Sequence, residues 1–243
     1  NWAKPLPALV VEGGQVAGRI RDAQGKFNLN NLVRNGAPSA PDIGTFQHLL
    51  QSLSLDPNLT DAVIDWIDMD NDARSTGAED IDYLQMKTPY RAANQPMQSV
   101  EELRLVRGFT PEMVDKLRPW ITALPQPTEI NVNTAPKEVL SALFYTLPAP
   151  AIDQLISQRP YTDPVQLTKK IQELVTSPDF KAFYGIKSSY FEVTIDTLFG
   201  RYRRTTQALI QRAPGDSGSL VLWHSQRLPT KFADSATTSG EKP

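Results

Sequence analysis

The stretch Phe-Glu-Val-Thr-Ile-Asp at residues 191–196 alternates apolar and polar side chains with a period of two. This alternation is typical of a β-strand that presents one apolar face. The same pattern occurs near the start of the chain, at residues 16–22, and again in the runs 201–212 and 220–223. Strands are therefore expected at both ends of the chain, and a sheet built from them must join segments that are far apart in sequence.

The middle of the chain has the spacing of helices instead. Apolar side chains at residues 46–53 and 59–67 recur at three- and four-residue intervals. Residues 99–102, Ser-Val-Glu-Glu, form a capping box that predicts a helix start. The order of strands, helices and strands favours an α+β fold in which a helical domain is inserted into a sheet. Two consecutive domains would be less economical, because the N-terminal strands alone could not form a stable sheet.

The expected domain boundaries follow from these patterns. Residues 1–36 and 186–229 are assigned to the sheet domain, and residues 37–185 to the inserted helical domain. Residues 230–243 are polar and lack periodicity, so we expect a disordered tail. Residues 22–26, Asp-Ala-Gln-Gly-Lys, have the composition of a hairpin turn within the sheet.

Composition argues against several classes of protein. A chain of 243 residues with 40% apolar residues, 21% charged residues and a net charge of −2 is ordinary for a globular protein and unlike a general binder of nucleic-acid phosphates. The absence of cysteine removes disulfides, thiolate metal sites and cysteine nucleophiles. No apolar run of ~20 residues that could span a bilayer occurs, and the start at Asn1 indicates a mature or truncated fragment. Because no P-loop, Gly-x-Ser-x-Gly motif or dinucleotide fingerprint is present, we expect no enzyme.

One segment is strongly acidic. Between Asp61 and Asp82 there are eight acidic residues and one basic residue, Arg74. Residues 68–79 read Asp-Met-Asp-Asn-Asp-Ala-Arg-Ser-Thr-Gly-Ala-Glu, which places acids at the first, third, fifth and twelfth positions of an EF-hand-like loop. Carboxylate oxygens at this spacing can converge on one cation, so the sequence predicts calcium ligation by four side chains, namely Asp68, Asp70, Asp72 and Glu79.

Two departures separate this loop from an EF-hand. Its sixth position is Ala73 where an EF-hand has glycine, and no clear exiting helix follows Glu79. Asp82 and Asn94 could add ligands or hold a second ion. A solvated acidic face is the competing interpretation, and magnesium is the competing ion, although magnesium usually keeps more of its waters. Eight crowded acids do not resemble a catalytic pair, which needs two carboxylates in unlike environments.

A second interpretation comes from residues 103–117 and 130–140, which resemble helix-hairpin-helix units. Many such units bind DNA phosphates through the backbone N–H groups of a Gly-x-Gly hairpin. Only Gly108 is present here, and the bases at residues 104–118 are offset by neighbouring acids. Structural packing is favoured over nucleic-acid binding, and a calcium-dependent hydrolase is a third, weaker alternative.

Several motifs, in this order, resemble the K-type minor pseudopilins of bacterial type II secretion. The resemblance covers nearly the whole chain and looks closest to a pseudomonad member. It rests on Gly-Lys-Phe-Asn-Leu-Asn-Asn-Leu at 25–32, Asp-Trp-Ile-Asp-Met-Asp at 65–70, Gly-Ala-Glu-Asp at 77–80, Pro-Tyr-Arg-Ala-Ala-Asn-Gln-Pro at 89–96, Ser-Val-Glu-Glu-Leu-Arg-Leu-Val at 99–106, and Ile-Asn-Val-Asn-Thr-Ala-Pro at 130–136.

The resemblance implies a pilin-like antiparallel sheet, formed by the N- and C-terminal strands, with a large helical insertion. It also implies an N-terminal apolar helix that anchors the native protein in the bacterial inner membrane, with the present chain as its periplasmic part. In this family the K subunit caps the pseudopilus tip and nucleates assembly for protein export across the outer membrane. The implied partners are the I-type and J-type minor pseudopilins, with a secreted substrate as a further candidate and no nucleic acid.

The family's helical domain binds calcium, and that role transfers to positions of this sequence that match its motifs. The residues implied are Asp68, Asp70, Asp72 and Glu79, together with Asp82 and Asn94. In this setting the acidic loop is expected to be a structural staple and to have no catalytic use.

Overall fold

The computed structural model describes residues 6–175, 181–213 and 218–227. Contacts divide the chain into two units. One comprises Asn1–Asp22 and Ser189–Pro243, and the other comprises Ala23–Ser188. We name the first the sheet unit and the second the helical unit. The predicted disordered tail at 230–243 lies outside the described residues.

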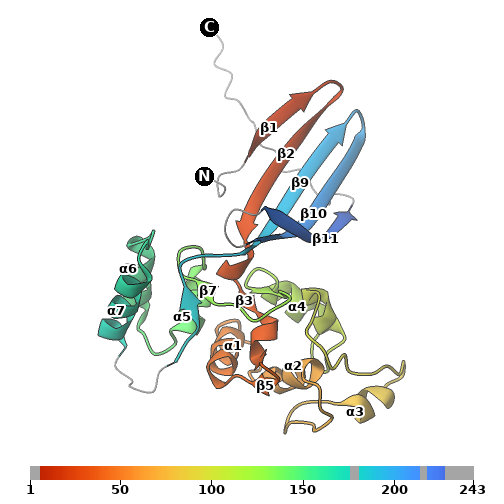
Figure 1. Cartoon of the computed structure of the whole chain (residues 1–243). Helices are drawn as coiled ribbons and strands as arrows, with labels where there is room; N and C mark the ends of the chain where they lie inside the picture. Colours follow the sequence, from red (N-terminus) through yellow and green to blue (C-terminus); the bar gives the residue numbers. More distant parts are fainter. Residues whose placement is uncertain (1–5, 176–180, 214–217, 228–243) are drawn as a thin grey trace. The chain divides into compact units, whose positions relative to one another are not determined.

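The sheet unit is a five-stranded antiparallel sheet with the order β1-β2-β9-β10-β11 (Figure 1). At its centre β2 pairs with β9, with Gly14 opposite Phe199 and Asp22 opposite Phe191. The first and last parts of the chain thus meet in one sheet, which confirms the predicted α+β class. The strands are β1 (Leu6–Val11), β2 (Gly14–Asp22), β9 (Tyr190–Phe199), β10 (Tyr202–Arg212) and β11 (Ser219–Arg227).

The N-terminal hairpin turns at Gly13 and Gly14. Gly13 has a φ of +79°, and a Cβ on Gly14 would come within 2.2 Å of the Leu198 carbonyl oxygen, so glycine is required at both positions. The hairpin turn expected at residues 22–26 is wrong. A 3-10 helix, η1 (Ala23–Gly25), begins there instead, and the chain leaves the sheet.

The first boundary between the units therefore falls after Asp22, whereas the sequence pattern suggested residue 36. The physical reason is the burial of the residues that follow. Phe27 is fully buried and stacks on Phe46 with ring centroids 5.3 Å apart. Its strand β3 (Phe27–Asn28) pairs in parallel with β6 (Ile121–Thr122) of the helical unit. The apolar residues at 27–32, which the sequence pattern assigned to the sheet domain, thus belong to the helical unit's core.

The helical unit consists of short helices joined by irregular segments. The predicted start signals are confirmed: Ser99 accepts a hydrogen bond from the Glu101 N–H, and Thr110 accepts one from the Met113 N–H. The segment after Ser99 is a 3-10 helix.

The α-helices are α1 (Ala40–Ser52), α2 (Leu59–Ile67), α3 (Asp80–Leu84), α4 (Pro111–Leu117), α5 (Lys137–Leu143), α6 (Ala149–Ser157) and α7 (Pro164–Leu174). The 3-10 helices are η1, η2 (Leu29–Leu32) and η3 (Val100–Arg104), and the remaining short strands are β4 (Val33–Arg34), β5 (Ala37–Pro38), β7 (Ile130–Asn131) and β8 (Tyr184–Gly185).

One continuous apolar core fills the helical unit. Buried asparagines fix irregular segments against that core. Asn30 donates to the carbonyl oxygens of Met97 and Leu124 at 2.8 Å each and accepts from the Met97 N–H at 2.8 Å. Both polar atoms of the Asn30 amide thus find backbone partners, and the segment around Met97, just after Asn94, is tied to the N-terminal part of the unit. Among the described residues, no helix is both long and apolar enough to cross a membrane.

Candidate cation site in the acidic loop

The acidic loop begins where α2 ends. α2 buries most of its length, including Val63, Ile64 and Trp66. Asp68 caps its C-terminus with extended backbone, and the Asp68 N–H donates to the Ile64 carbonyl oxygen at 2.8 Å. Because the helix is anchored by apolar packing, the first acid of the loop starts from a fixed position.

Three of the six predicted ligands lie together. Carboxylate oxygens of Asp68, Asp70 and Glu79 are all within 4.8 Å of one another. Calcium binds oxygen ligands at about 2.3–2.6 Å, so one ion between these groups could contact all three. Asp68 and Glu79 are buried and Asp70 is exposed, which leaves one side of the cluster open to solvent.

The buried oxygens of this cluster lack partners, which is the main reason to regard it as a cation site. Asp68 Oδ1 and both Oε atoms of Glu79 are buried without a hydrogen-bond partner, as are Asp65 Oδ1 and Asn94 Oδ1. Glu79 is only 2% exposed. An unpaired buried carboxylate is costly, whereas a bound cation supplies the missing partner. The donors are all oxygen, which fits a hard cation such as calcium or magnesium.

The electrostatics agree with this fit. Burial, together with the charge of Asp70, raises the pKa of Asp68 to about 6. Burial and the charges of Asp65, Asp68 and Asp70 raise the pKa of Glu79 to about 7. Without a cation, these carboxylates resist ionisation because they are desolvated and repel one another.

Two predicted ligands are not part of the cluster. Asp72 is exposed, and its N–H donates to Asp70 Oδ1 at 3.0 Å. Asp82 accepts from the Glu79 N–H at 3.2 Å and forms an ion pair with Arg107 at 2.9 Å. Asp82 therefore orients Glu79 through the backbone, and its position gives no support to a ligand role.

Asn94, the sixth predicted ligand, lies against the loop. Its backbone has a φ of +46°, and its N–H donates to the Trp66 carbonyl oxygen at 3.1 Å. Its side-chain amide is 3.4 Å from the Asp70 carbonyl oxygen and 3.4 Å from Asn71 Oδ1. Asn94 thus links the later segment to the acidic loop, and its buried Oδ1 remains available as a ligand.

A helix follows Glu79, contrary to the sequence expectation. Glu79 is the N-cap of α3, and its N–H donates to the Asp82 side chain. The helix is only five residues long, too short for a helical period to be visible in the sequence. Tyr83 anchors it, fully buried with its ring 5.3 Å from that of Trp66 and 5.3 Å from that of Tyr90. The loop is thus flanked by helices on both sides.

The sequence analysis missed Asp65. Its side chain is fully buried in α2, and its Oδ2 accepts from the Arg74 N–H at 3.1 Å. Gly77 lies so close that a Cβ there would meet Asp65 Oδ2 at 1.8 Å. Burial, opposed by the Arg74 N–H and reinforced by the charge of Asp68, raises the pKa of Asp65 to about 6. The signal that could have identified Asp65 from the sequence is its spacing, because it precedes Asp68 by about one helical turn.

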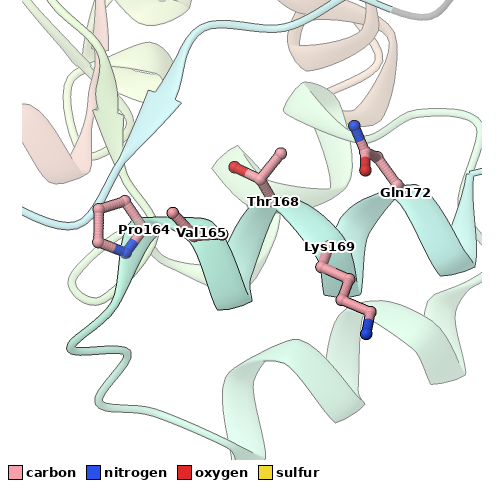
Figure 2. A pocket seen from close by; sticks show the side chains of 5 residues that line it. All are labelled: Pro164, Val165, Thr168, Lys169 and Gln172. Carbon is pink, nitrogen blue, oxygen red and sulfur yellow. The ribbon is translucent and has the colours of Figure 1, made fainter.

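A surface hollow elsewhere in the helical unit has different chemistry. It lies along α7 and is lined by Pro164, Val165, Thr168, Lys169 and Gln172 (Figure 2). Among these lining residues, Lys169 is the one charged group, and none is a carboxylate or imidazole that could serve as a general base. This hollow therefore does not suggest a reaction site.

In the segment that resembles a helix-hairpin-helix unit, Arg104 and Arg118 are paired with acids. Arg104 lies 3.1 Å from Glu101 and 3.3 Å from Asp115. Arg118 pairs with Asp115 at 2.8 Å and also with Glu101. Gly108, with a φ of +89°, supplies a single turn glycine. Arginines engaged in this way are poorly placed to neutralise phosphates.

Comparison with known proteins gives a consistent result. Residues 25–126 and 130–187 match two family models, both described as type II secretion system (T2SS), protein K. The chain is 33% identical to the type II secretion system protein K of Pseudomonas aeruginosa, over 87% of this chain and 65% of that protein. It is also 33% identical to the Aeromonas hydrophila protein of the same name, over 91% of this chain and 73% of that protein.

A solved structure agrees with these matches. The chain superposes with a TM-score of 0.77 and 27% identity on the crystal structure of the GspK-GspI-GspJ complex from the enterotoxigenic Escherichia coli type 2 secretion system. The match covers 93% of this chain and 84% of the other. Both units contribute to a match of this extent.

Proposed function

Because this chain belongs to the type II secretion system protein K family, we propose that it caps the tip of the type II secretion pseudopilus. As a member of this family it is a minor pseudopilin and a component of the protein transport machinery. Its part at the tip is the specific proposal. The observation that carries it is the match, over 93% of the chain, to a complex named for K, I and J subunits.

The proposed partners are the I-type and J-type minor pseudopilins. Support comes from the relative that forms a GspK-GspI-GspJ complex. The helical unit, inserted between β2 and β9, makes this subunit much larger than a bare sheet. In our proposal that bulk prevents further subunits from adding beyond it, so the protein starts assembly and remains at the tip.

We propose that the chain acts as the periplasmic part of a bacterial inner-membrane protein. The family's place in type II secretion supports this location. The chain spans 65% of the length of its Pseudomonas aeruginosa relative and 73% of its Aeromonas hydrophila relative. We propose that the native protein is anchored in the membrane by an N-terminal helix.

We further propose that the acidic loop binds calcium through Asp68, Asp70 and Glu79, with Asn94 Oδ1 beside them. When bound, calcium neutralises the buried carboxylates. The protein's own contribution is to position them: α2 fixes Asp68, the Asp82 side chain fixes the Glu79 backbone, and Asp65 fixes the loop at the Arg74 N–H. The site thus serves as a structural staple in a protein without catalytic activity.

Assembly provides the test of the tip role. The chain is mixed with I-type and J-type minor pseudopilins and analysed by size exclusion with light scattering. We expect a stable complex that contains all three, while mixtures with one partner alone serve as controls for pairwise binding. Separate elution of the three proteins would contradict the proposal. A salt-dependent shift of DNA in place of assembly would favour the helix-hairpin-helix alternative.

A further inference from the structure

The turns of two hairpins form one end of the sheet unit. The Gly200 N–H donates to the Gly13 carbonyl oxygen at 2.9 Å. The Phe199 ring lies over Gly13, where an added Cβ would be 3.2 Å from the ring. This turn end, as we name residues 11–14 and 199–204, is opposite the strand ends at Asp22 and Tyr190, near which the chain leaves the sheet.

The turn end is basic and aromatic. Residues 201–204 read Arg-Tyr-Arg-Arg, and all four are exposed. Tyr202 is 70% exposed and Phe199 is 58% exposed. The Arg201 guanidinium carbon lies 5.7 Å from the centre of the Tyr202 ring. The acid at this end is Glu12, so a local positive charge stands out in a chain whose net charge is −2.

The arginines extend from both faces of the sheet. Arg203 is paired with Leu198 and Arg204 with Thr197, and neighbouring residues of a strand point to opposite faces. A partner that covered one face would reach only one of these side chains. A surface that lies across the ends of the strands can contact both arginine side chains and also Arg201, which is in the turn between β9 and β10. The geometry thus favours a broad anionic surface over a ligand bound to one face.

We propose that the turn end rests on an anionic phospholipid surface, an interaction separate from the proposed assembly at the tip. Guanidinium groups bind phosphate through paired N–H donors. Aromatic side chains such as Tyr202 and Phe199 favour the boundary between headgroups and hydrocarbon. A hollow whose lining includes Phe199, Tyr202 and Arg204 places aromatic and cationic groups together there.

Vesicle co-sedimentation tests this proposal with a charge-matched control. The chain is incubated at low salt with vesicles of phosphatidylglycerol and phosphatidylcholine, or of phosphatidylcholine alone. The test variant is Arg201→Gln/Arg204→Gln. The control, Arg19→Gln/Arg21→Gln, removes the same charge from β2, where Arg19 is opposite Thr194 and Arg21 is opposite Glu192, away from the turn end.

We expect the unmodified chain and the control to sediment with the anionic vesicles and to be released by salt. The test variant should partition at least tenfold less, because each arginine near such a surface raises partitioning by roughly fivefold. Tyr202→Ser should also weaken vesicle binding, but it should change the salt dependence of binding less than the test variant does. Circular dichroism melts of each variant verify that the sheet is intact.

Three results would overturn the proposal. The first is that the unmodified chain fails to bind anionic vesicles, and the second is that the test and control variants lose binding equally. The third is that the test variant keeps full vesicle binding but no longer co-elutes with the I-type and J-type subunits. That outcome would assign the turn end to an acidic protein surface.

Discussion

The helical unit and the sheet unit bury their residues very differently. The helical unit contains almost the entire apolar core, whereas the described part of the sheet unit has Leu209 and Tyr190 as its buried large apolar residues. Val10 and Leu220 on its outer strands are 78% and 60% exposed. Within the sheet unit the strands form a single layer, so its stability comes mainly from strand pairing and cross-strand contacts. The helical unit therefore holds most of the apolar packing of the described chain, and the sheet unit contributes little to it.

The largest expected effect compares the packing of the two units by making the same isoleucine-to-alanine substitution in each. Ile152→Ala removes a fully buried side chain from α6, and Ile195→Ala removes one from β9 that is 38% exposed. We expect the first to lower the free energy of unfolding by about 2–5 kcal/mol and the second by about 1 kcal/mol. Urea unfolding with hydrogen exchange resolved by peptide measures both. Equal losses would show that the sheet contributes as much packing as the helical core.

The next prediction concerns calcium and restricts its effect to one unit. At a free calcium concentration 100 times its Kd, binding should add about 2.7 kcal/mol to the stability of the helical unit relative to chelator. Thermal melts should therefore separate, and hydrogen exchange should slow at residues 59–84 while strands β9 and β10 are unchanged. Coincident melts, with no metal found by native mass spectrometry, would remove the calcium proposal.

Gly77 gives a smaller and more local effect. Gly77→Ala directs a methyl group at Asp65 Oδ2, 1.8 Å from the ideal Cβ position. We expect a loss of about 1–3 kcal/mol from this overpacking, together with weaker calcium binding in titration calorimetry. Gly44→Ala, within α1, is the control. Its added Cβ would lie 3.6 Å from Tyr145, an ordinary van der Waals distance. A Gly77→Ala protein as stable as the control would show that the loop can shift without cost.

The sequence predicts periodic elements well and contacts between segments poorly. Strands at both ends and the helix starts at Ser99 and Thr110 are visible because period and capping are local properties. Residues 22–26 were predicted as a hairpin turn because they have turn composition, and only the burial of Phe27 distinguishes this segment from the turn at Gly13. Local composition could not show that Phe27 packs on Phe46.

The acidic loop shows the same limit at the level of single residues. Alternate spacing correctly groups Asp68, Asp70 and Glu79, because it follows the chain through one loop. It fails to separate them from Asp82, whose partner Arg107 is distant in sequence. It also omits Asp65, which acts from within a helix. Residues that share a motif can thus differ in burial and in their partners, and only tertiary contacts distinguish them.

The smallest expected effect distinguishes Glu79, a proposed calcium ligand, from Asp82, which caps α3. The same chemical change is made at both residues. Glu79→Gln and Asp82→Asn each replace a carboxylate with an amide of nearly the same shape. Glu79 has both oxygens buried without partners, so its substitution should reduce calcium affinity by tenfold or more, measured by calorimetry. Asp82 is a half-exposed cap paired with Arg107. Its loss should cost about 0.5–1 kcal/mol of stability and change calcium affinity less than threefold. Equal losses of affinity would return Asp82 to the ligand set, because capping alone cannot account for the removal of a metal contact.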